Sequence, residues 1–421
     1  MPSRFEFSPI KLVYGGDALG HHAGRTVLAP RILPGEQAEV EELRTQKGVV
    51  HARPVRILTA SPDRVEPPCP YFGRCGGCQY QHLSAEKQPV TKAEILRETL
   101  RRLGTINWDA DIPIHSGPAW NYRNQAQLKI GHCGEVEAAL GFYEQESNRL
   151  VAIEACPILS PRLNAVLTEL RGERCQKWLR HAREVELFAD DRDEHVMLTL
   201  HGVWEPREAE LLAADMLGTL ASTVAIEQQS SGKVYGEPHL TYRVGEHAYQ
   251  VSPTSFFQSS RFLLPDFVAT VIGENSGAVA MDLFAGVGLF TLPLARRFDQ
   301  VIAVESHPRA AADLRANSLS AGGNVRVVSD TVFDFLRRSA QSEPDLVVMD
   351  PPRAGVGIAA LKLLLGLRPR RLSYVSCSPP TLARDLGFLT QHGYRLESLD
   401  MFDLFPQTYH IESLARLSRR E

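Results

Sequence analysis

The chain has 421 residues, of which 43% are hydrophobic and 23% are charged, a composition typical of globular proteins with two or three domains. The formal net charge of −4 excludes binding to nucleic acid through overall charge, so any phosphate-binding surface must be local. No apolar run reaches the roughly 18 residues of a membrane span, and the N-terminal residues lack the apolar core of a secretory signal. We therefore expect a cytoplasmic protein that does not contact a membrane.

Short strand-like runs alternate with turns over residues 1–64. Turn signals stand at Gly15-Gly16-Asp17 and at Pro34-Gly35-Glu36, and several short strands with regular turns predict a small closed barrel. A proline-rich stretch over residues 63–70 marks the end of this domain. A basic amphipathic helix is expected over residues 87–102, and a solvated face explains its charged side chains more simply than an RNA site does.

The rest of the chain divides into two regions that differ in their pattern of predicted strands and helices. Residues 65–250 mix strands with one or two helices and show no catalytic constellation, which predicts a linking α+β domain. Over residues 251–421 strands and helices alternate. Such alternation predicts an α/β domain, with a parallel sheet, right-handed crossovers and helices on both faces.

A glycine-rich turn joins a buried strand to a helix at Asp282-Leu-Phe-Ala-Gly286-Val-Gly288. Glycine lets the backbone turn sharply and approach a ligand closely. The next two strands end in Glu305 and Asp330, and acids at the carboxyl edge of a parallel sheet suit a nucleoside ligand. Each acid alone could be a helix N-cap, but the set favours a binding site. The chain lacks a Gly-x-x-x-x-Gly-Lys motif, which argues against ATP hydrolysis.

Two further motifs follow later strands of the same predicted sheet, Asp350-Pro-Pro-Arg353 and Ser376-Cys-Ser-Pro379. Both are expected at the carboxyl edge that holds the glycine-rich turn. Cys377 precedes a predicted helix whose N-terminal dipole would favour a nucleophilic thiolate, although most free cysteines are small buried hydrophobic residues. Near the C-terminus, His410 and Glu412 share one face if their segment is a strand, and either could act as a base.

The seven cysteines are an odd number, which argues against a disulfide framework in a chain with no secretory signal. Three of them, Cys69, Cys75 and Cys78, are clustered. This spacing predicts a metal or cluster site, with Cys133 and Cys175 as ordinary thiols.

Together these motifs resemble the uridine-5 RNA methyltransferase family over nearly the whole chain. Residues 376–385, Ser-Cys-Ser-Pro-Pro-Thr-Leu-Ala-Arg-Asp, are similar to the family's nucleophile motif, and residues 406–412, Pro-Gln-Thr-Tyr-His-Ile-Glu, are similar to its C-terminal motif. The resemblance implies a Rossmann-like class I methyltransferase domain with Cys377 as nucleophile and Glu412 as general base. The residues that it places against S-adenosylmethionine or the active-site edge are Gln258, Phe284, Glu305, Asp330 and Asp350.

The resemblance also implies a reaction. The Cys377 thiolate adds to carbon 6 of uracil, carbon 5 then attacks the methyl group, and Glu412 removes the carbon 5 proton so that the cysteine can leave. Asp350 would bind the uracil edge of a flipped nucleotide. The N-terminal barrel resembles a TRAM domain, an OB-like RNA-binding module. The ligands implied for a structural 4Fe–4S cluster are Cys69, Cys75, Cys78 and Cys156.

Four thiolates also suit a structural zinc, and spacing alone does not separate the two, although the lack of a second Cys-x-x-Cys pair counts against a zinc ribbon. The sequence departs from the family pattern at Ser378, where Asn is usual, at Gln407, where His is frequent, and at Leu289, where a polar residue is common. None of these changes the nucleophile or the base.

The alternative from another functional class is a non-enzymatic RNA-binding iron–sulfur protein. The set of Cys377, Asp350 and Glu412 argues against it, because a protein that only binds RNA needs no nucleophile. Among enzymes, an amino-group methyltransferase usually pairs Pro-Pro with an aromatic residue where this chain has Arg353. A cytosine-5 enzyme would have Pro where this chain has Ser376. We expect a monomer that acts on 23S ribosomal RNA, with transfer RNA as the alternative substrate.

Overall fold

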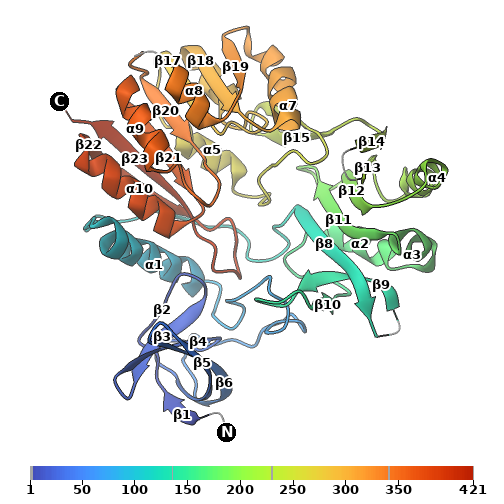
Figure 1. Cartoon of the computed structure of the whole chain (residues 1–421), viewed down its shortest axis with the longest axis vertical. Helices are drawn as coiled ribbons and strands as arrows, with labels where there is room; N and C mark the ends of the chain where they lie inside the picture. Colours follow the sequence, from blue (N-terminus) through green and yellow to red (C-terminus); the bar gives the residue numbers. More distant parts are fainter. Residues whose placement is uncertain (1–2, 135, 229–230, 340–341, 421) are drawn as a thin grey trace.

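The computed structural model describes residues 3–134, 136–228, 231–339 and 342–420. Within these residues the strands form sheets of six, seven and eight strands and one two-stranded hairpin. Figure 1 shows the three larger sheets in separate parts of the molecule, with the N-terminal sheet at one end and the C-terminal sheet, covered by helices, at the other. No helix in the described part of the chain is both long and apolar enough to cross a membrane.

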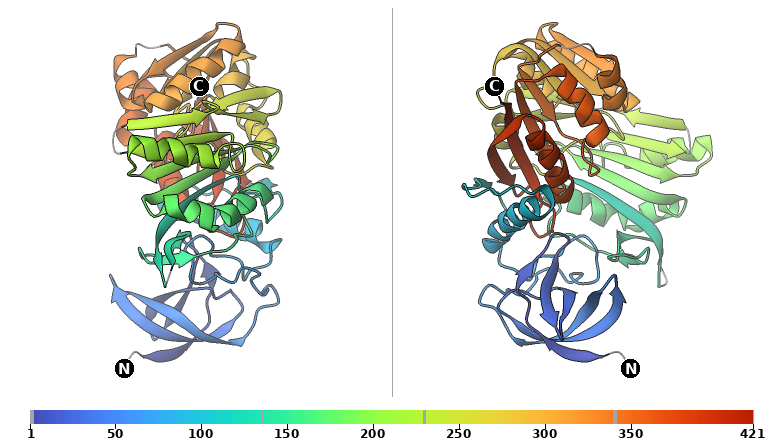
Figure 2. Two further views of the ribbon diagram at one scale, coloured as in Figure 1. Left: turned by 90° about the vertical axis from the view of Figure 1, so that its right-hand side faces the viewer. Right: turned by 60° about the vertical axis from the view of Figure 1, so that its left-hand side comes forward.

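The N-terminal sheet is strongly curved (Figure 2) and encloses a small apolar core that includes Phe7, Val27, Val40 and Val50. Its strand order is β1-β5-β6-β4-β3-β2. Buried and exposed residues alternate along these strands, which is the pattern of a sheet with one face in a core. The strands are β1 (Arg4–Phe7), β2 (Lys11–Leu12), β3 (Asp17–His22), β4 (Arg25–Pro30), β5 (Gln37–Gln46) and β6 (Val49–Thr59).

The central sheet has the strand order β10-β9-β8-β11-β12-β13-β14 and carries helices on one face (Figure 1). In β11 the side chains of Val185 and Leu187 are buried in the core with these helices, whereas Glu184 and Glu186 lie on the other face. The strands are β8 (Gln125–Cys133), β9 (Val136–Tyr143), β10 (Leu150–Ala152), β11 (Ala182–Ala189), β12 (Val196–Gly202), β13 (Thr223–Gln228) and β14 (Ser231–Gly236). The helices are α2 (Pro161–Leu170), α3 (Glu173–Leu179) and α4 (Pro206–Met216).

The C-terminal sheet has the strand order β19-β18-β17-β20-β21-β23-β22-β7. The first five of these strands are parallel, and β23 is antiparallel to both of its neighbours. The order reverses direction at β17, and such a switch point places a ligand crevice outside the carboxyl ends of the strands. The strands are β17 (Gly277–Leu283), β18 (Phe298–Glu305), β19 (Val325–Ser329), β20 (Leu346–Met349), β21 (Arg371–Ser376), β22 (Tyr394–Phe402), β23 (Glu412–Arg419) and β7 (Ile114–His115).

Helices cover both faces of this sheet, as the alternating pattern predicts. One face packs against α8 (Val332–Arg338), α9 (Ile358–Leu367), α10 (Pro379–Gln391) and α1 (Lys87–Gly104). The other packs against α5 (Leu264–Ile272), α6 (Thr291–Ala295) and α7 (Pro308–Ser318). The hairpin of β15 (Leu240–Val244) and β16 (His247–Val251) joins the second of these cores.

Two local expectations are wrong. The helix expected to begin at Gly288 is only the short α6, because Gly288 has φ +102° and β18 already begins at Phe298. The segment before Glu412 is not a strand, because Gln407 has the left-handed φ of +69° and β23 begins only at Glu412. His410 and Glu412 therefore do not share a strand face.

Helix α1 and strand β7 contact the C-terminal sheet although they lie within residues 65–250. A Cβ atom on Gly104 of α1 would come within 2.6 Å of the Ala383 carbonyl oxygen of α10, so glycine is needed for this close approach. Strand β7 pairs with β22 at the sheet edge. The domain division at residues 64 and 250 stays a prediction.

Candidate active site

Cys377 lies between the end of β21 and the start of α10, at the carboxyl edge of the sheet. The adjoining backbone is fixed on both sides. The Ser378 N–H donates to Ser376 Oγ at 3.1 Å, and Ser413 Oγ of β23 donates to the Ser376 carbonyl at 3.0 Å. The Cys377 side chain is half-buried. The sequence thus places this thiol on a rigid strand-to-helix turn with partial access to solvent.

Glu412 is brought beside Cys377 by the antiparallel pairing of β21 and β23, in which Ser376 lies opposite Ser413. Its side chain is 3% exposed, and Oε1 is buried without a hydrogen-bond partner in the structure. Burial, together with the nearby Asp350 carboxylate, raises the pKa of Glu412 well above its usual value. A buried carboxyl oxygen without a partner is expensive unless it serves a ligand or a reaction.

Asp350 completes this group from the end of β20. Gln258 Nε2 donates to Asp350 Oδ2 at 3.4 Å, so two residues predicted to contact the cofactor or the uracil touch each other. Burial raises the pKa of Asp350 to about 7. The structure therefore brings Gln258, Asp350, Cys377 and Glu412 together from four segments of the chain.

The protonation of Cys377 differs from the expectation. Burial, followed by the nearby Glu412 and Asp350 carboxylates, raises the pKa of its thiol to about 12, while Arg353 acts in the opposite sense. The expected thiolate at a helix N-terminus is wrong for the free protein, because loss of water and two neighbouring carboxylates outweigh the helix dipole. A nucleophilic role for this thiol would require a neighbouring base to take its proton.

The predicted cofactor residues lie at the carboxyl ends of β17, β18 and β19. Phe284 follows β17 with a left-handed φ of +67°, a strained geometry that clusters at functional sites. Glu305 accepts backbone N–H bonds from Gly286 at 2.9 Å and His307 at 2.6 Å. A Cβ at Gly286 would meet no atom within 4 Å, so the turn borders open space at the switch point. This arrangement fits a nucleoside ligand.

Asp330 has partners of its own. It forms an ion pair with Arg338 and accepts the Thr331 N–H at 2.9 Å. Asp282, at the end of β17, is fully buried and bonded to the Thr291 hydroxyl, and burial raises its pKa to about 7. Asp282 therefore supports the turn from inside.

Two contacts at the site were not singled out from the sequence. The Tyr14 hydroxyl of the N-terminal domain donates to the Cys377 carbonyl oxygen at 3.3 Å, and no local pattern around Tyr14 could have indicated it. Arg353 lies 3.3 Å from His410 Nε2. Burial and the Arg353 charge lower the pKa of His410 to about 3, which makes His410 a weaker base than Glu412.

The four cysteines of the predicted cluster line one cavity of about 180 Å³. Cys156 reaches it although it lies far from the other three in sequence, and Asn164 fixes its backbone through two hydrogen bonds, of 2.8 and 3.0 Å. Burial raises the pKa of Cys78 to about 12 and that of Cys156 to about 11. Four converging thiols screened from water fit a buried metal centre. Cys133 is exposed and Cys175 lies in the central core.

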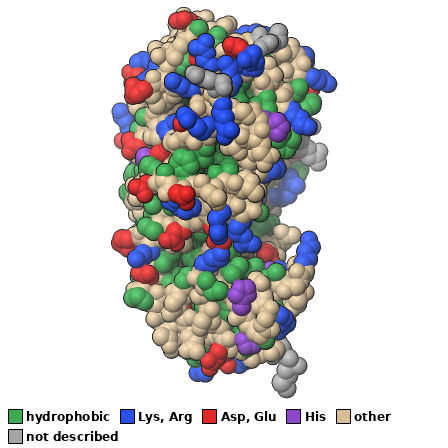
Figure 3. Space-filling model, turned by 90° about the vertical axis from the view of Figure 1, so that its left-hand side faces the viewer, with side chains coloured by type: hydrophobic (Ala, Val, Ile, Leu, Met, Phe, Trp, Pro, Cys, Tyr) green, Lys and Arg blue, Asp and Glu red, His purple; other side chains and the backbone are tan. Residues whose placement is uncertain are grey.

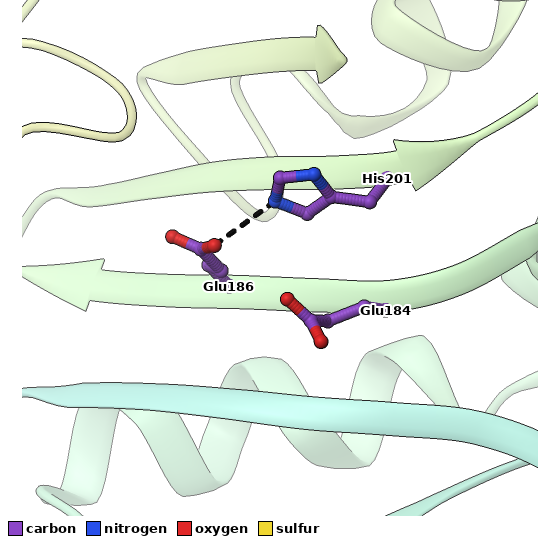
Figure 4. Close-up of side chains that lie close together, drawn as sticks. All are labelled: Glu184, Glu186 and His201. Atoms are coloured by element: carbon purple, nitrogen blue, oxygen red, sulfur yellow. Dashed lines mark hydrogen bonds and ion pairs between the residues drawn. The ribbon is translucent and has the colours of Figure 1, made fainter. Parts of the chain in front are cut away.

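In the described part of the chain, one group of acidic and histidine side chains has ligand atoms that all lie within 4.8 Å of one another. This group consists of Glu184, Glu186 and His201. Figure 4 shows them on neighbouring strands β11 and β12. His201 Nε2 is 2.9 Å from Glu186 Oε1, and Glu184 forms an ion pair with Lys129 of β8. Because each charge already has a partner, we assign no metal to this group.

The Rossmann-like sheet, its open glycine-rich turn and the polar residues at its carboxyl edge define a class I methyltransferase. Residues 84–420 match the model of the tRNA (uracil-5-)-methyltransferase family, and the chain belongs to this family. It is therefore an RNA uracil-5 methyltransferase that uses S-adenosylmethionine, so the non-enzymatic alternative is wrong.

Two relatives match over almost their whole length. An uncharacterized RNA methyltransferase of Aquifex aeolicus is 35% identical over 98% of this chain and 97% of its own. The 23S rRNA (uracil(1939)-C(5))-methyltransferase RlmD of Alkalilimnicola ehrlichii is 33% identical over 99% of this chain and 96% of its own.

A solved structure has the same fold. The Pyrococcus abyssi tRNA (uracil-54, C5)-methyltransferase in complex with S-adenosyl-L-homocysteine superposes with a TM-score of 0.76 and 24% identity. The match covers 98% of this chain and 100% of that chain. The predicted fold class is confirmed.

Proposed function

We propose that this enzyme, acting as a monomer, methylates carbon 5 of a uridine in 23S ribosomal RNA through a covalent adduct between Cys377 and carbon 6. The observation that carries the mechanism is the pairing of β21 with β23. It sets a cysteine beside a buried carboxylate that has a free oxygen. A methyltransferase acting on a nucleophilic nitrogen would need neither group.

The residue chemistry follows from the weakness of carbon 5 as a nucleophile. Cys377 sulfur forms a bond to carbon 6, and the electron pair of the 5,6 double bond moves toward oxygen 4. Bound S-adenosylmethionine supplies an electrophilic methyl group for carbon 5. Glu412 then takes the carbon 5 proton, the 5,6 double bond reforms, and the Cys377–carbon 6 bond breaks to release the thiolate.

The two buried carboxyl groups also account for the first proton. Asp350, with a pKa of about 7, is partly ionised at neutral pH and lies near the neutral Cys377 thiol. The Asp350 carboxylate can receive the thiol proton during attack, and Glu412 must be ionised in the complex with RNA to take the carbon 5 proton later. Glu412 is a better candidate for the base than His410, whose pKa near 3 makes it a poor proton acceptor.

The proposed cofactor contacts are Gln258, Phe284, Glu305, Asp330 and Asp350. The observations that support these contacts differ from residue to residue. Glu305 and Phe284 border the open turn, and Gln258 is hydrogen-bonded to Asp350, whose carboxylate lies near Cys377. Asp330 would bind only beside its ion pair with Arg338, so its contribution should be the smallest of the set.

We propose that Cys69, Cys75, Cys78 and Cys156 hold a 4Fe–4S cluster with a structural role. Zinc bound by four thiolates at about 2.3 Å would draw each pair of sulfurs to about 3.8 Å. The four thiols line one cavity of about 180 Å³, and four cysteine thiolates are the usual ligand set of a 4Fe–4S cluster.

Ribosomal RNA is favoured because the RlmD relative covers nearly the whole of both chains. Transfer RNA is the alternative, since the solved Pyrococcus abyssi neighbour is a tRNA (uracil-54, C5)-methyltransferase. The N-terminal sheet, proposed as a TRAM domain, would bind RNA beside the site, because Tyr14 contacts the Cys377 backbone.

The nucleophile is tested with RNA that contains 5-fluorouridine, in which carbon 5 has no proton to lose. The wild-type enzyme should form an adduct that survives a denaturing gel, whereas Cys377→Ala should form none and lose turnover by several orders of magnitude. Cys133→Ala is the matched control, because Cys133 is exposed, and it should behave like wild type. An adduct that persists in Cys377→Ala would exclude Cys377 as the nucleophile.

A further inference from the structure

The loop that leads into Glu412 is held in an unfavourable backbone conformation. Residues 403–411 join β22 to β23, and within them Gln407 has a φ of +69° and is 1% exposed. A left-handed conformation at a residue other than glycine persists only where surrounding contacts fix it. The contacts that fix this one come from distant parts of the chain.

Gln88, in the first turn of α1, forms a reciprocal pair with Gln407. Its Oε1 accepts the Gln407 backbone N–H at 2.7 Å, and its Nε2 donates to Gln407 Oε1 at 2.9 Å. The same Nε2 also donates to the carbonyls of Tyr80 and Leu83. Gln88 is 1% exposed, so water cannot easily replace these bonds.

Helix α1 and the segment after β7 hold the rest of the loop. Lys92, one turn beyond Gln88, donates to Asp403 Oδ1 at 2.6 Å and to the Phe405 carbonyl at 2.9 Å. The Lys92 side chain is fully buried. The Tyr122 hydroxyl donates to the Pro406 carbonyl at 3.0 Å.

The segment that follows Cys78 supplies further contacts. The backbone N–H groups of Gln79 and Tyr80 both donate to the Gln407 carbonyl, at 3.0 and 2.9 Å. Gln79 Oε1 accepts the Tyr409 N–H at 3.3 Å. The loop that carries the base is thus bonded to the residues next to the cysteine cavity.

We propose that Gln88 and Tyr122 are positioning residues for proton removal. They hold residues 406 and 407 in place and thereby fix the position of Glu412. This inference rests on the proposed role of Glu412 as the base. Cys377 follows β21, in a different segment of the chain from this loop. Displacement of the loop should therefore slow removal of the carbon 5 proton more than addition to carbon 6 or methyl transfer.

The test compares Gln88→Glu and Tyr122→Phe with wild type. Gln88→Glu keeps the size of the side chain but replaces the donor group with an oxygen that faces three acceptor oxygens. Tyr122→Phe keeps the buried ring and removes one hydroxyl. Both should leave KM for RNA and for S-adenosylmethionine nearly unchanged and lower kcat by roughly 10- to 100-fold. Both should also accumulate a methylated covalent complex on denaturing gels.

Asn324→Asp is the matched control. Asn324 Nδ2 donates to the carbonyls of Ala295 and Phe298, so this variant also exchanges a donor for an oxygen. It precedes β19, at the end of the sheet opposite Cys377. It should lower stability without accumulating the complex.

The outcomes separate this inference from the assignment of the base. If Glu412→Gln accumulates the complex while Gln88→Glu and Tyr122→Phe turn over like the control, Glu412 is the base and the positioning inference is wrong. If Glu412→Gln turns over normally, the base assignment itself has failed. An equal loss of adduct formation and turnover in Tyr122→Phe would reveal a merely structural role and overturn the inference, even where Gln88→Glu does not fold.

Discussion

Three neighbouring side chains at the candidate site can carry a negative charge, those of Asp350, Glu412 and Cys377. A negative charge on one of them disfavours ionisation of the others. Burial is the largest cause of the raised pKa of each, and the neighbouring charges add to it for Cys377 and Glu412. The free protein therefore holds a neutral thiol beside two carboxyl groups whose protonated forms are favoured by burial.

The raised pKa of Asp350 predicts a pH-dependent cost in stability. The folded-state pKa of about 7 lies above the unfolded value, so the folded protein binds this proton more tightly and loses stability as pH rises from about 4 through about 7. Asp350→Asn has no such charge. Its free energy of unfolding should match wild type near pH 4 and exceed it by roughly 2–4 kcal/mol above pH 7. Denaturant unfolding across this range measures the difference, and a difference independent of pH would contradict the burial argument.

Individual residues could be predicted where a motif marks them and not where a distant contact defines them. Cys377 and Glu412 stand in recognisable motifs, and the structure places them together. The expected thiolate was wrong because a helix N-terminus stabilises a nearby negative charge by only about 0.3–1 kcal/mol. This corresponds to less than one pKa unit. Burial of Cys377 beside two carboxylates shifts its pKa in the opposite direction and by more. The bonds of Tyr14 and Gln88 span 363 and 319 residues, so no local pattern signals them.

Among the elements, the four-cysteine cavity makes the clearest prediction. Protein purified without oxygen should be brown and contain about four iron and four sulfide per chain. Cys156→Ala should lose this content and unfold at lower temperature, because it removes a ligand from the segment that Asn164 fixes. Cys175→Ala, in the central core, should retain the iron. One zinc and no iron in wild type would contradict the proposed cluster.

Elements with a strong local signal could be predicted closely. Helix α1, expected over residues 87–102, covers Lys87–Gly104, because an apolar stripe that includes Ile95, Leu96 and Leu100 forms its buried face. The short α3 and the hairpin of β15 and β16 were not foreseen. Neither was the turn at Gln407, since its conformation depends on Gln88 and Tyr80 rather than on neighbours in sequence.

At the scale of the whole molecule, the active site is shared between domains. The N-terminal region supplies Tyr14, the segment before β17 supplies Gln258, and the C-terminal sheet supplies the proposed nucleophile and base. The fold class could be inferred from alternating patterns, but the packing of the three larger sheets against one another could not. Figure 3 shows positive and negative side chains interspersed on one face, in keeping with a net charge of −4.

This arrangement predicts a defined RNA substrate rather than binding by overall charge. Deletion of the gene should remove 5-methyluridine from one position or a small set of positions in 23S ribosomal RNA and leave transfer RNA unchanged. Mass spectrometry of the two RNA fractions measures both. Loss confined to transfer RNA would select the alternative substrate and leave the chemistry at Cys377 intact.

The central claim is that Cys377 forms the adduct and Glu412 resolves it. The most direct measurement is the mass of the peptide that carries Cys377 after Glu412→Gln has reacted with RNA and S-adenosylmethionine. Glutamine keeps the shape of the side chain but is a poor proton acceptor. The account predicts a peptide linked to an already methylated uridine, which wild type releases. Normal turnover by Glu412→Gln, with the methylated adduct trapped instead by His410→Ala, would contradict it.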